Sequence, residues 1–255
     1  MLGPSLLLLL VGALGLGCTD DSGGATPGSA GRGRRGSGSD AHAIRLPSEP
    51  YRVGALPAFG TLRGTVTVDG ALPADSIVTP AVDQSVCGTG ISAPSVVHEG
   101  NGLGNVVVWL SDVPVGKPLP IERRTEVLNE DCVLDPHVQA VIAGTTVNVR
   151  NEDRLPHTTV FLRAGTSDTL RVIPLTDDGQ VVPDEHLAAS AGLIEIRCRQ
   201  HPWTRGYIAV FNTPYFAVSE PNGSFQIDSL PPGKYHLVAW HERGTRRVEQ
   251  DVEVQ

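Results

Sequence analysis

From residue 60 onward, the chain consists of short segments in which hydrophobic and polar residues alternate, separated by turn-forming residues. A two-residue period predicts half-buried β-strands, because successive side chains of a strand point to opposite faces. Compact apolar runs of similar length are consistent with strands buried on both faces. The clearest predicted strands are residues 65–68, 106–110, 138–142, 146–149, 193–196, 207–210, 225–227, 235–240 and 252–254.

The rest of the pattern agrees with β structure. Helical periodicity is weak, and only a short helical turn around residues 184–190 is expected. The composition includes 29 Gly and 20 Pro, which mark frequent turns, and Val leads the apolar residues. Asp69-Gly70 is typical of a hairpin turn. The predicted fold class is therefore all-β, with the rhythm of a sandwich.

Residues 1–18 contain an apolar stretch that ends at Cys18 and is too short to span a bilayer as a helix. It fits the apolar region of a signal peptide, and Gly17 before Cys18 resembles the cleavage site of bacterial lipoproteins, in which the cysteine is lipidated. Leu16 stands where a smaller residue is usual, and an ordinary signal peptide is the alternative. Residues 19–55, rich in Gly and Ser at their start, are predicted to be a disordered linker.

Charge limits the possible partners. The formal net charge is −8 and no long basic run occurs, so nucleic acid is not an expected partner. The predicted lipid anchor and linker would hold the folded part near a membrane. We therefore expect an exported protein, in the periplasm or on the outer surface.

Two sets of motifs resemble known families, and they interleave along the chain. The segments 56–118 and 214–255 resemble a carboxypeptidase regulatory-like domain, a small transthyretin-like β-sandwich. The motifs that carry this resemblance are Gly64-Thr65-Val66, Gly70 with Leu72-Pro73, Asn105-Val106-Val107-Val108, Asn222-Gly223-Ser224-Phe225-Gln226-Ile227 and Leu230-Pro231-Pro232-Gly233-Lys234-Tyr235. The resemblance implies a fold and says little about chemistry.

The segment 119–213 resembles a cupredoxin, a Greek-key β-sandwich that binds one copper ion. The motifs are residues 136–144, residues 147–153, Leu155-Pro156-His157-Thr158, residues 192–196, Cys198-Arg199-Gln200-His201-Pro202-Trp203 and residues 206–210. Because the first set of motifs lies on both sides of the second, we expect the copper domain to be nested in a loop of the other sandwich. The alternative is one irregular sandwich made of both.

The cupredoxin resemblance implies a mononuclear copper site at His157, Cys198 and His201. Two imidazoles and one thiolate are the donor set of blue-copper electron-transfer sites. Cupredoxins usually place a weak axial Met after the second His, whereas this chain has Thr204 there, and its single Met is Met1. The site would be three-coordinate, axially bound by Thr204 or a backbone carbonyl, or degenerate. Zinc is the competing metal, since two His, one Cys and a water form an open tetrahedral set.

Asn151 and Trp203 are expected to support the site. The resemblance implies that Asn151 braces the cysteine loop by hydrogen bonds, and that Trp203 shields the metal or provides an exit for electrons. If Cys18 carries lipid and Cys198 holds metal, Cys87 and Cys132 remain to form a disulfide in an oxidising compartment. The other histidines are assigned simpler roles. His98 and His186 are loop candidates that could reach a metal, and His137, His236 and His241 are expected to be structural.

The leading hypothesis is a membrane-tethered, one-electron copper carrier that serves an unidentified redox protein. One alternative is a copper-binding or copper-handling protein without electron transfer, which the missing axial Met suggests. Another is an adhesion or carbohydrate-binding module with a degenerate metal site. We expect no enzyme, because no Ser-His-Asp order, phosphate loop or pair of catalytic carboxylates stands out.

Overall fold

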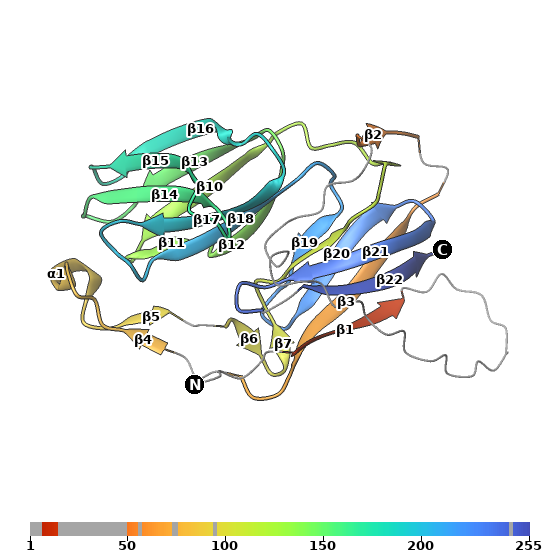
Figure 1. The fold of residues 1–255 in the computed structure, drawn as a ribbon, viewed down its shortest axis with the longest axis horizontal. Helices are drawn as coiled ribbons and strands as arrows, with labels where there is room; N and C mark the ends of the chain where they lie inside the picture. Colours follow the sequence, from red (N-terminus) through yellow and green to blue (C-terminus); the bar gives the residue numbers. More distant parts are fainter. Residues whose placement is uncertain (1–6, 15–49, 56–57, 73–75, 94–95, 245–246) are drawn as a thin grey trace.

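The structure is a computed structural model of the 255-residue chain, and it describes residues 7–14, 50–55, 58–72, 76–93, 96–244 and 247–255, the first of these for the backbone alone. The predicted lipidation site Cys18 and most of the predicted linker lie outside the described residues. Almost every described element is a strand, so the all-β prediction is confirmed. Two sandwiches lie side by side (Figure 1).

The first sandwich, called here the split sandwich, is built from segments on both sides of the second. One of its sheets contains β1 (Leu7–Leu14), β3 (Gly60–Asp69), β6 (His98–Glu99), β7 (Gly102–Leu103) and β20 (Ser224–Leu230). The other contains β8 (Val107–Leu110), β19 (Phe216–Val218), β21 (Gly233–Trp240) and β22 (Val248–Val254). A short parallel pair, β2 (Arg52–Val53) and β9 (Val115–Gly116), lies beside them.

The second, continuous sandwich runs without interruption from β10 to β18. One sheet is formed by β10 (Arg124–Glu130), β11 (Val133–Asp135), β13 (Thr145–Asn151) and β16 (Val181–Ala188). The other is formed by β12 (Val138–Ile142), β14 (His157–Arg163), β15 (Thr169–Leu175), β17 (Gly192–Cys198) and β18 (Arg205–Phe211). The helical turn expected around residues 184–190 was wrong, because residues 184–188 continue β16 and residues 189–190 form a bend.

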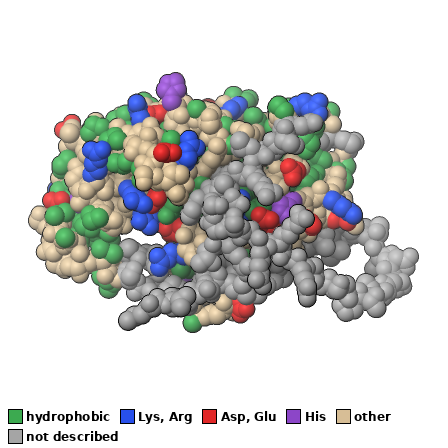
Figure 2. All heavy atoms as spheres, viewed as in Figure 1, with side chains coloured by type: hydrophobic (Ala, Val, Ile, Leu, Met, Phe, Trp, Pro, Cys, Tyr) green, Lys and Arg blue, Asp and Glu red, His purple; other side chains and the backbone are tan. Residues whose placement is uncertain are grey.

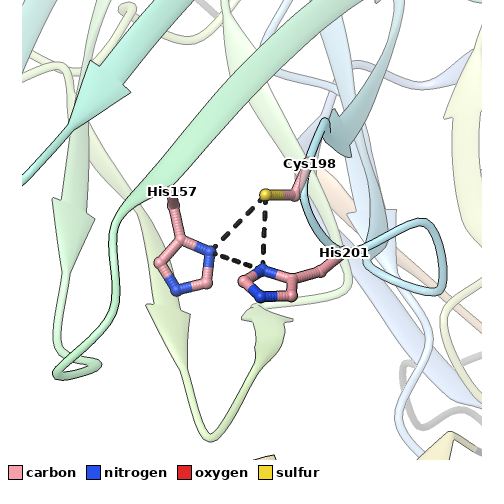
Figure 3. A group of neighbouring side chains, drawn as sticks. All are labelled: His157, Cys198 and His201. Atoms are coloured by element: carbon pink, nitrogen blue, oxygen red, sulfur yellow. Dashed lines mark hydrogen bonds between the residues drawn. The ribbon is translucent and has the colours of Figure 1, made fainter. Parts of the chain in front are cut away.

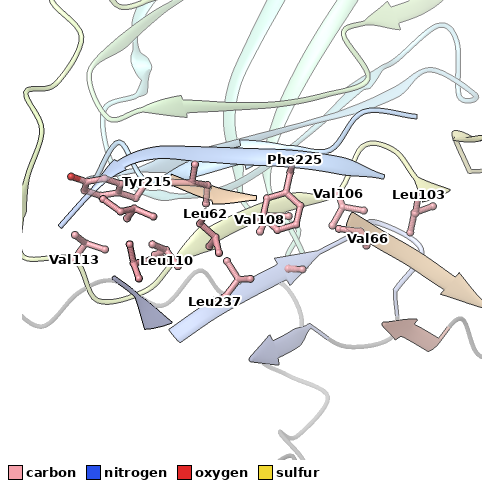
Figure 4. Close-up of a cluster of buried hydrophobic side chains, with 14 of the residues drawn as sticks. Leu62, Val66, Leu103, Val106, Val108, Leu110, Val113, Tyr215, Phe225 and Leu237 are labelled. Carbon is pink, nitrogen blue, oxygen red and sulfur yellow. The ribbon is translucent and has the colours of Figure 1, made fainter. Parts of the chain in front are cut away.

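Long-range pairing joins the two halves of the split sandwich. Phe225 of β20 lies opposite Gly64 of β3, and β8 pairs with both β19 and β21. The ring of Phe225 lies directly over Gly64, and no larger residue fits there, because an added Cβ would lie 2.5 Å from the ring. Strands from before and after the continuous sandwich therefore share both sheets of the split sandwich. The split sandwich encloses a core of apolar side chains between its two sheets (Figure 4).

Local sequence sets the topology at one turn and fails to set it at another. Pro231-Pro232 lies between β20 and β21, which belong to opposite sheets, so the chain changes sheet at this corner. Asp69-Gly70 ends β3 but forms no hairpin, which corrects the sequence prediction. The strand that follows, β4 (Ser76–Val78), pairs instead with β5 (Ile91–Ala93). β3 is already flanked by β1 on one side and by β20 and β7 on the other.

β1 coincides with the predicted apolar region of the signal peptide. It pairs antiparallel with β3 from Leu7 opposite Asp69 to Leu14 opposite Leu62. If the segment is a signal peptide, it is removed on export, and this pairing exists only in the unprocessed chain.

Each sandwich has its own apolar core, and the two pack against each other through a third one. In β8, Val107 and Trp109 face this interface, whereas Val108 and Leu110 face the interior of the split sandwich. Strand β18 alternates in the same way. These strands are therefore buried on both faces, which explains their unbroken apolar sequence. The interface core consists of Val107, Trp109, Val138, Ala164, Leu193, Tyr207, Ala209, Phe211, Val238 and Trp240.

A projecting segment, residues 76–93, is called here the arm. It contains β4, β5 and the short helix α1 (Gln84–Cys87), and it reaches below the continuous sandwich in Figure 1. Cys87 in α1 is joined to Cys132, between β10 and β11, by a disulfide. The arm thus belongs in sequence to the split sandwich and is bonded covalently to the continuous one.

Surface charge is mixed where it can be seen. Basic and acidic side chains are interspersed over the visible part of the face in Figure 2. Within the described residues, no helix is long and apolar enough to cross a bilayer.

Candidate metal centre

The structure brings His157, Cys198 and His201 together at one end of the continuous sandwich (Figure 3). His157 is the first residue of β14 and Cys198 the last residue of β17. These strands are antiparallel neighbours, with Thr159 opposite Cys198, so the two ends lie at the same edge of the sheet. His201 follows in the loop that leads to β18. Spacing along the strands and one short loop therefore place all three side chains at a single point.

The distances fit the ligands of one ion. Sγ of Cys198 lies 3.5 Å from Nδ1 of His157 and 3.5 Å from Nδ1 of His201, and the two Nδ1 atoms are 3.2 Å apart. Two ligands that each lie about 2 Å from an ion are themselves separated by about 3–4 Å. All three residues are buried, with relative exposures of 1%, 4% and 0% in sequence order. A soft thiolate with two imidazoles suits copper or zinc better than a hard cation such as Mg²⁺.

The protonation states also prepare the site for a metal. Burial raises the pKa of a thiol, but the hydrogen bond from His157 and hydrogen bonds from the backbone lower the pKa of Cys198 to about 6. Burial lowers the pKa of an imidazole, but hydrogen bonds to Asp153 and Cys198 raise the pKa of His157 to about 9. In the metal-free chain at neutral pH, Cys198 is therefore a thiolate stabilised by the imidazolium of His157. The thiolate is the form that ligates metals.

Each histidine contacts a carboxylate through its outer nitrogen. Nε2 of His157 lies 2.9 Å from Oδ2 of Asp153, and Nε2 of His201 lies 3.1 Å from Oδ2 of Asp83. A carboxylate accepts the Nε2 proton and so leaves the Nδ1 lone pair free to face the ion. Burial raises the pKa of a carboxyl, but the hydrogen bonds with His157 and the backbone N–H of Cys132 hold the pKa of Asp153 below its usual value.

The sequence reasoning missed both carboxylates. Asp153 ends the motif of residues 147–153, four positions before His157. That short spacing was a signal that its carboxylate could contact the histidine. Asp83 gave no such signal, since it precedes His201 by 118 positions. Only the tertiary structure brings these two residues together.

Gln200 joins the loop after Cys198, called here the cysteine loop (residues 199–204), to the strand that carries His157. Its side-chain oxygen accepts a hydrogen bond from the backbone N–H of Thr158 at 2.9 Å, and its nitrogen donates to the Thr158 hydroxyl at 3.0 Å. The backbone N–H of Arg199 donates to the carbonyl of Thr158 at 3.1 Å. These bonds fix the spacing between Cys198 and His157 independently of any metal.

The prediction that Asn151 braces the cysteine loop was wrong. The side-chain nitrogen of Asn151 donates to the carbonyls of Leu155 and Asp177, at 2.9 and 3.1 Å. Its oxygen accepts the backbone N–H of Asp153 at 3.1 Å. Asn151 is the last residue of β13, so its fully buried side chain reaches the turn before His157 and the loop after β15. Asn151 therefore stabilises the turn that precedes His157.

Thr204 and Trp203 share one hydrogen-bond acceptor. The Thr204 hydroxyl donates to the carbonyl of Cys132 at 3.1 Å, and Nε1 of Trp203 donates to the same oxygen at 3.0 Å. The structure thus engages the Thr204 hydroxyl with the backbone of the β10–β11 turn. The Trp203 ring lies 5.1 Å from the His201 ring, centroid to centroid, and covers one side of it.

His98 and His186 do not belong to this group of ligands. Both were expected in loops, but His98 lies in β6 and His186 in β16. Within the part of the chain that the structure describes, His157, Cys198 and His201 form the one group of three or more His, Cys, Asp or Glu residues close enough to hold an ion.

Comparisons with known proteins found similarity only among solved structures. No protein-family model and no curated protein matches the chain. A Cu-containing nitrite reductase from Thermus scotoductus SA-01 matches with 22% identity and a TM-score of 0.31, over 37% of this chain and 23% of that one. The matched part is therefore less than a quarter of the reductase.

Two other solved structures match over most of their own length. A purple cupredoxin from Nitrosopumilus maritimus matches with 19% identity and a TM-score of 0.29, over 34% of this chain and 98% of that one. Amicyanin from Paracoccus versutus matches with 24% identity and a TM-score of 0.29, over 36% of this chain and 84% of that one. These are low scores, so the case for a metal site depends on the side chains themselves.

Proposed function

We propose that the chain binds a single copper ion through Nδ1 of His157, Nδ1 of His201 and Sγ of Cys198, and that this ion carries one electron. The observation that carries the proposal is the convergence of these three atoms within 3.5 Å of one another in a buried site. A bound copper ion would supply the redox chemistry. The protein residues hold the ligands, exclude water and fix the protonation state.

The packing around the ligands favours electron transfer over catalysis at the metal. Two antiparallel strands and the Gln200 bonds hold the ligands in place, so little rearrangement is needed between Cu(II) and Cu(I). The ligands have almost no exposure, which leaves little room for a substrate to reach the ion. A redox protein would then exchange electrons through the protein surface, for example near Trp203.

The direct test is to load purified protein with copper and record its visible and electron paramagnetic resonance spectra. An intense thiolate-to-copper charge-transfer band that disappears on reduction and returns on oxidation supports the proposal. Cys198→Ser should abolish the band. Binding of zinc but not copper, or no metal binding at all, would overturn it.

Copper handling without electron transfer is the second candidate. Two observations favour it: the Thr204 hydroxyl is engaged with Cys132, and Asp83 covers the outer nitrogen of His201. In that case copper would bind tightly but would not cycle reversibly between its two oxidation states. Cyclic voltammetry of the loaded protein distinguishes the two candidates.

The location of the protein is also proposed. The disulfide between Cys87 and Cys132 is typical of an oxidising compartment, which supports export. We propose that lipidation at Cys18 tethers the protein to a membrane. Labelling with a radioactive fatty acid, with Cys18→Ser as the control, tests this directly.

A further inference from the structure

The metal centre receives one polar contact from outside the continuous sandwich. Asp83 belongs to the arm, and its Oδ2 lies 3.1 Å from Nε2 of His201. The His201 side chain is fully buried, whereas that of Asp83 is 41% exposed. Asp83 therefore stands at the boundary between the His201 ring and the solvent.

The Asp83 side chain is not used for an ordinary local purpose. Asp83 is the N-cap residue of α1, a position where a carboxylate commonly accepts a backbone N–H of the first helical turn. Here the side chain makes no capping hydrogen bond, and the backbone carbonyl alone accepts the N–H groups of Val86 and Cys87. The carboxylate is directed at His201 instead.

The backbone of Asp83 also indicates a constrained position. Its φ and ψ angles, 56° and 27°, lie in the left-handed region that residues other than Gly seldom adopt. Asp and Asn tolerate this region better than most residues. An Asp→Asn substitution should therefore keep the backbone of the arm and change only the carboxylate.

Hydrophobic packing does not hold α1 in place. None of its four residues is buried, and Val82 and Val86 on the arm are exposed. What joins this helix to the continuous sandwich is the disulfide from Cys87 to Cys132 and the contact of Asp83 with His201. The disulfide is therefore the covalent link between the arm and the sandwich that carries His201.

Cys132 connects the disulfide to both histidines. Its backbone N–H donates to Asp153, which contacts His157, and its carbonyl accepts Trp203 and Thr204 from the loop that carries His201. Its sulfur is bonded to the helix that follows Asp83. Both carboxylates that face the ligand histidines are thus linked to this one half-cystine.

We propose that Asp83 is a positioning residue for His201, supplied by the arm, and that the Cys87–Cys132 disulfide keeps it in contact with the metal ligand. This inference rests on the proposed copper site. Asp83 accepts the Nε2 proton of His201 and so directs Nδ1 toward the ion. Its negative charge near the ligand stabilises Cu(II) relative to Cu(I) and lowers the reduction potential.

The first experiment compares the natural protein with Asp83→Asn. We expect copper affinity to fall about 10- to 100-fold, as is usual when the hydrogen-bond partner of a ligand histidine is changed. The reduction potential should rise, and the copper hyperfine splitting in the electron paramagnetic resonance spectrum should change. Asp131→Asn is the matched control, because it removes an exposed carboxylate beside Cys132 and also lies at positive φ.

A measurement on the metal-free protein makes the test independent of copper. The Nε2 proton of His201, observed by nitrogen-edited NMR, should be protected from exchange in the natural protein and in Asp131→Asn. It should exchange faster in Asp83→Asn, because a neutral amide oxygen is a weaker acceptor than a carboxylate. If copper fails to bind the natural protein but this proton behaves as expected, the proposed function fails while the positioning contact stands.

The second experiment removes the disulfide with the double variant Cys87→Ser/Cys132→Ser, which keeps the backbone groups of residue 132. Its potential and spectrum should shift in the same direction as those of Asp83→Asn. Adding Asp83→Asn to the double variant should change little more, because the contact is already lost. Unchanged potential, spectrum and proton exchange in Asp83→Asn would overturn the role of Asp83. Natural behaviour in the folded double variant would overturn the role of the disulfide.

Discussion

Sγ of Cys198 and Nδ1 of His157 lie 3.5 Å apart in a buried site, and each changes the ionisation of the other. Their hydrogen bond contributes to a lower pKa for the thiol and a higher pKa for the imidazole. The contact therefore keeps Cys198 in its thiolate form at neutral pH in the metal-free protein. A metal ion that binds Nδ1 must displace the proton from His157.

The first prediction is that the metal-free protein contains a thiolate at neutral pH. Its ultraviolet thiolate absorbance should disappear as the pH falls through about 6, the pKa of Cys198. Cys198→Ser supplies the baseline. In His157→Gln the transition should move to higher pH, because the stabilising imidazolium is gone. A thiolate that forms only near the ordinary cysteine pKa of about 8.5 in the natural protein would contradict the prediction.

The second prediction concerns His241, which is buried just after β21. Burial lowers the pKa of His241 to about 4, so the folded chain keeps it neutral where the unfolded chain, with a histidine pKa of about 6.5, takes up a proton. Between these two values the unfolded state binds more protons, and the free energy of unfolding must fall as the pH falls.

From pH 7 to pH 5, His241 should lower the free energy of unfolding by about 2 kcal/mol. The loss is about 1.4 kcal/mol for each pH unit below the pKa of the unfolded state. His241→Asn removes the group but retains an acceptor for the backbone N–H of Arg243. Urea unfolding gives the loss of stability between the two pH values for each protein. The loss in the natural protein minus the loss in His241→Asn is the contribution of His241. An equal loss of stability in both proteins would show that His241 is protonated in the fold.

The third prediction concerns the interface between the sandwiches. Phe211 is buried in the interface core, where its ring stacks with that of Phe216 at a centroid distance of 4.9 Å. Phe211→Ala should lower the free energy of unfolding by about 3–5 kcal/mol, because it leaves a cavity. Phe59→Ala is the control, since Phe59 is 68% exposed and its loss should cost less than about 0.5 kcal/mol.

Calorimetry provides the measurement for this third prediction. The natural protein should unfold in one transition, because the two sandwiches share a core. Two separate transitions in the natural protein, or equal stabilities of the two variants, would mean that the interface contributes little.

Many strands could be predicted because their signals are local, and the group of His157, Cys198 and His201 because its motifs resemble those of cupredoxins. A two-residue period identifies a strand such as β13, and Cys198 and His201 are separated by one short loop. Several strands, among them β10, β14, β15 and β16, were not among the clearest predictions. β15 contains Pro174 at a position opposite Thr158, and such a sequence shows a weak strand pattern.

The surroundings of the ligands could not be predicted from local patterns. The contact of Asp83 with His201 depends on how the arm folds back, and the bonds of Asn151 depend on which loop lies beside the end of β13. The position of the Thr204 side chain also required the structure, since its nearest acceptor is the carbonyl of Cys132. Sequence reasoning identified the three residues that lie together, and tertiary packing determines their surroundings.

The last prediction concerns the axial position of the proposed copper site. The Thr204 hydroxyl donates to the carbonyl of Cys132 and keeps its lone pairs, but it is a hard, neutral donor, so we expect it to give little electron density to the ion. A site without axial donation is close to trigonal, and it favours Cu(I) more than a site with a thioether ligand does. Thr204→Met should therefore lower the reduction potential.

Thr204→Val is the matched control, because it removes the hydroxyl bond to Cys132 but keeps the β-branched shape and adds no donor. Its potential should stay closer to that of the natural protein than the potential of Thr204→Met does. Redox titration of the three copper-loaded proteins, followed through the charge-transfer band, gives the comparison. A higher potential in Thr204→Met than in the natural protein would mean that Thr204 or a water already donates to the ion, and the trigonal description would have to be abandoned.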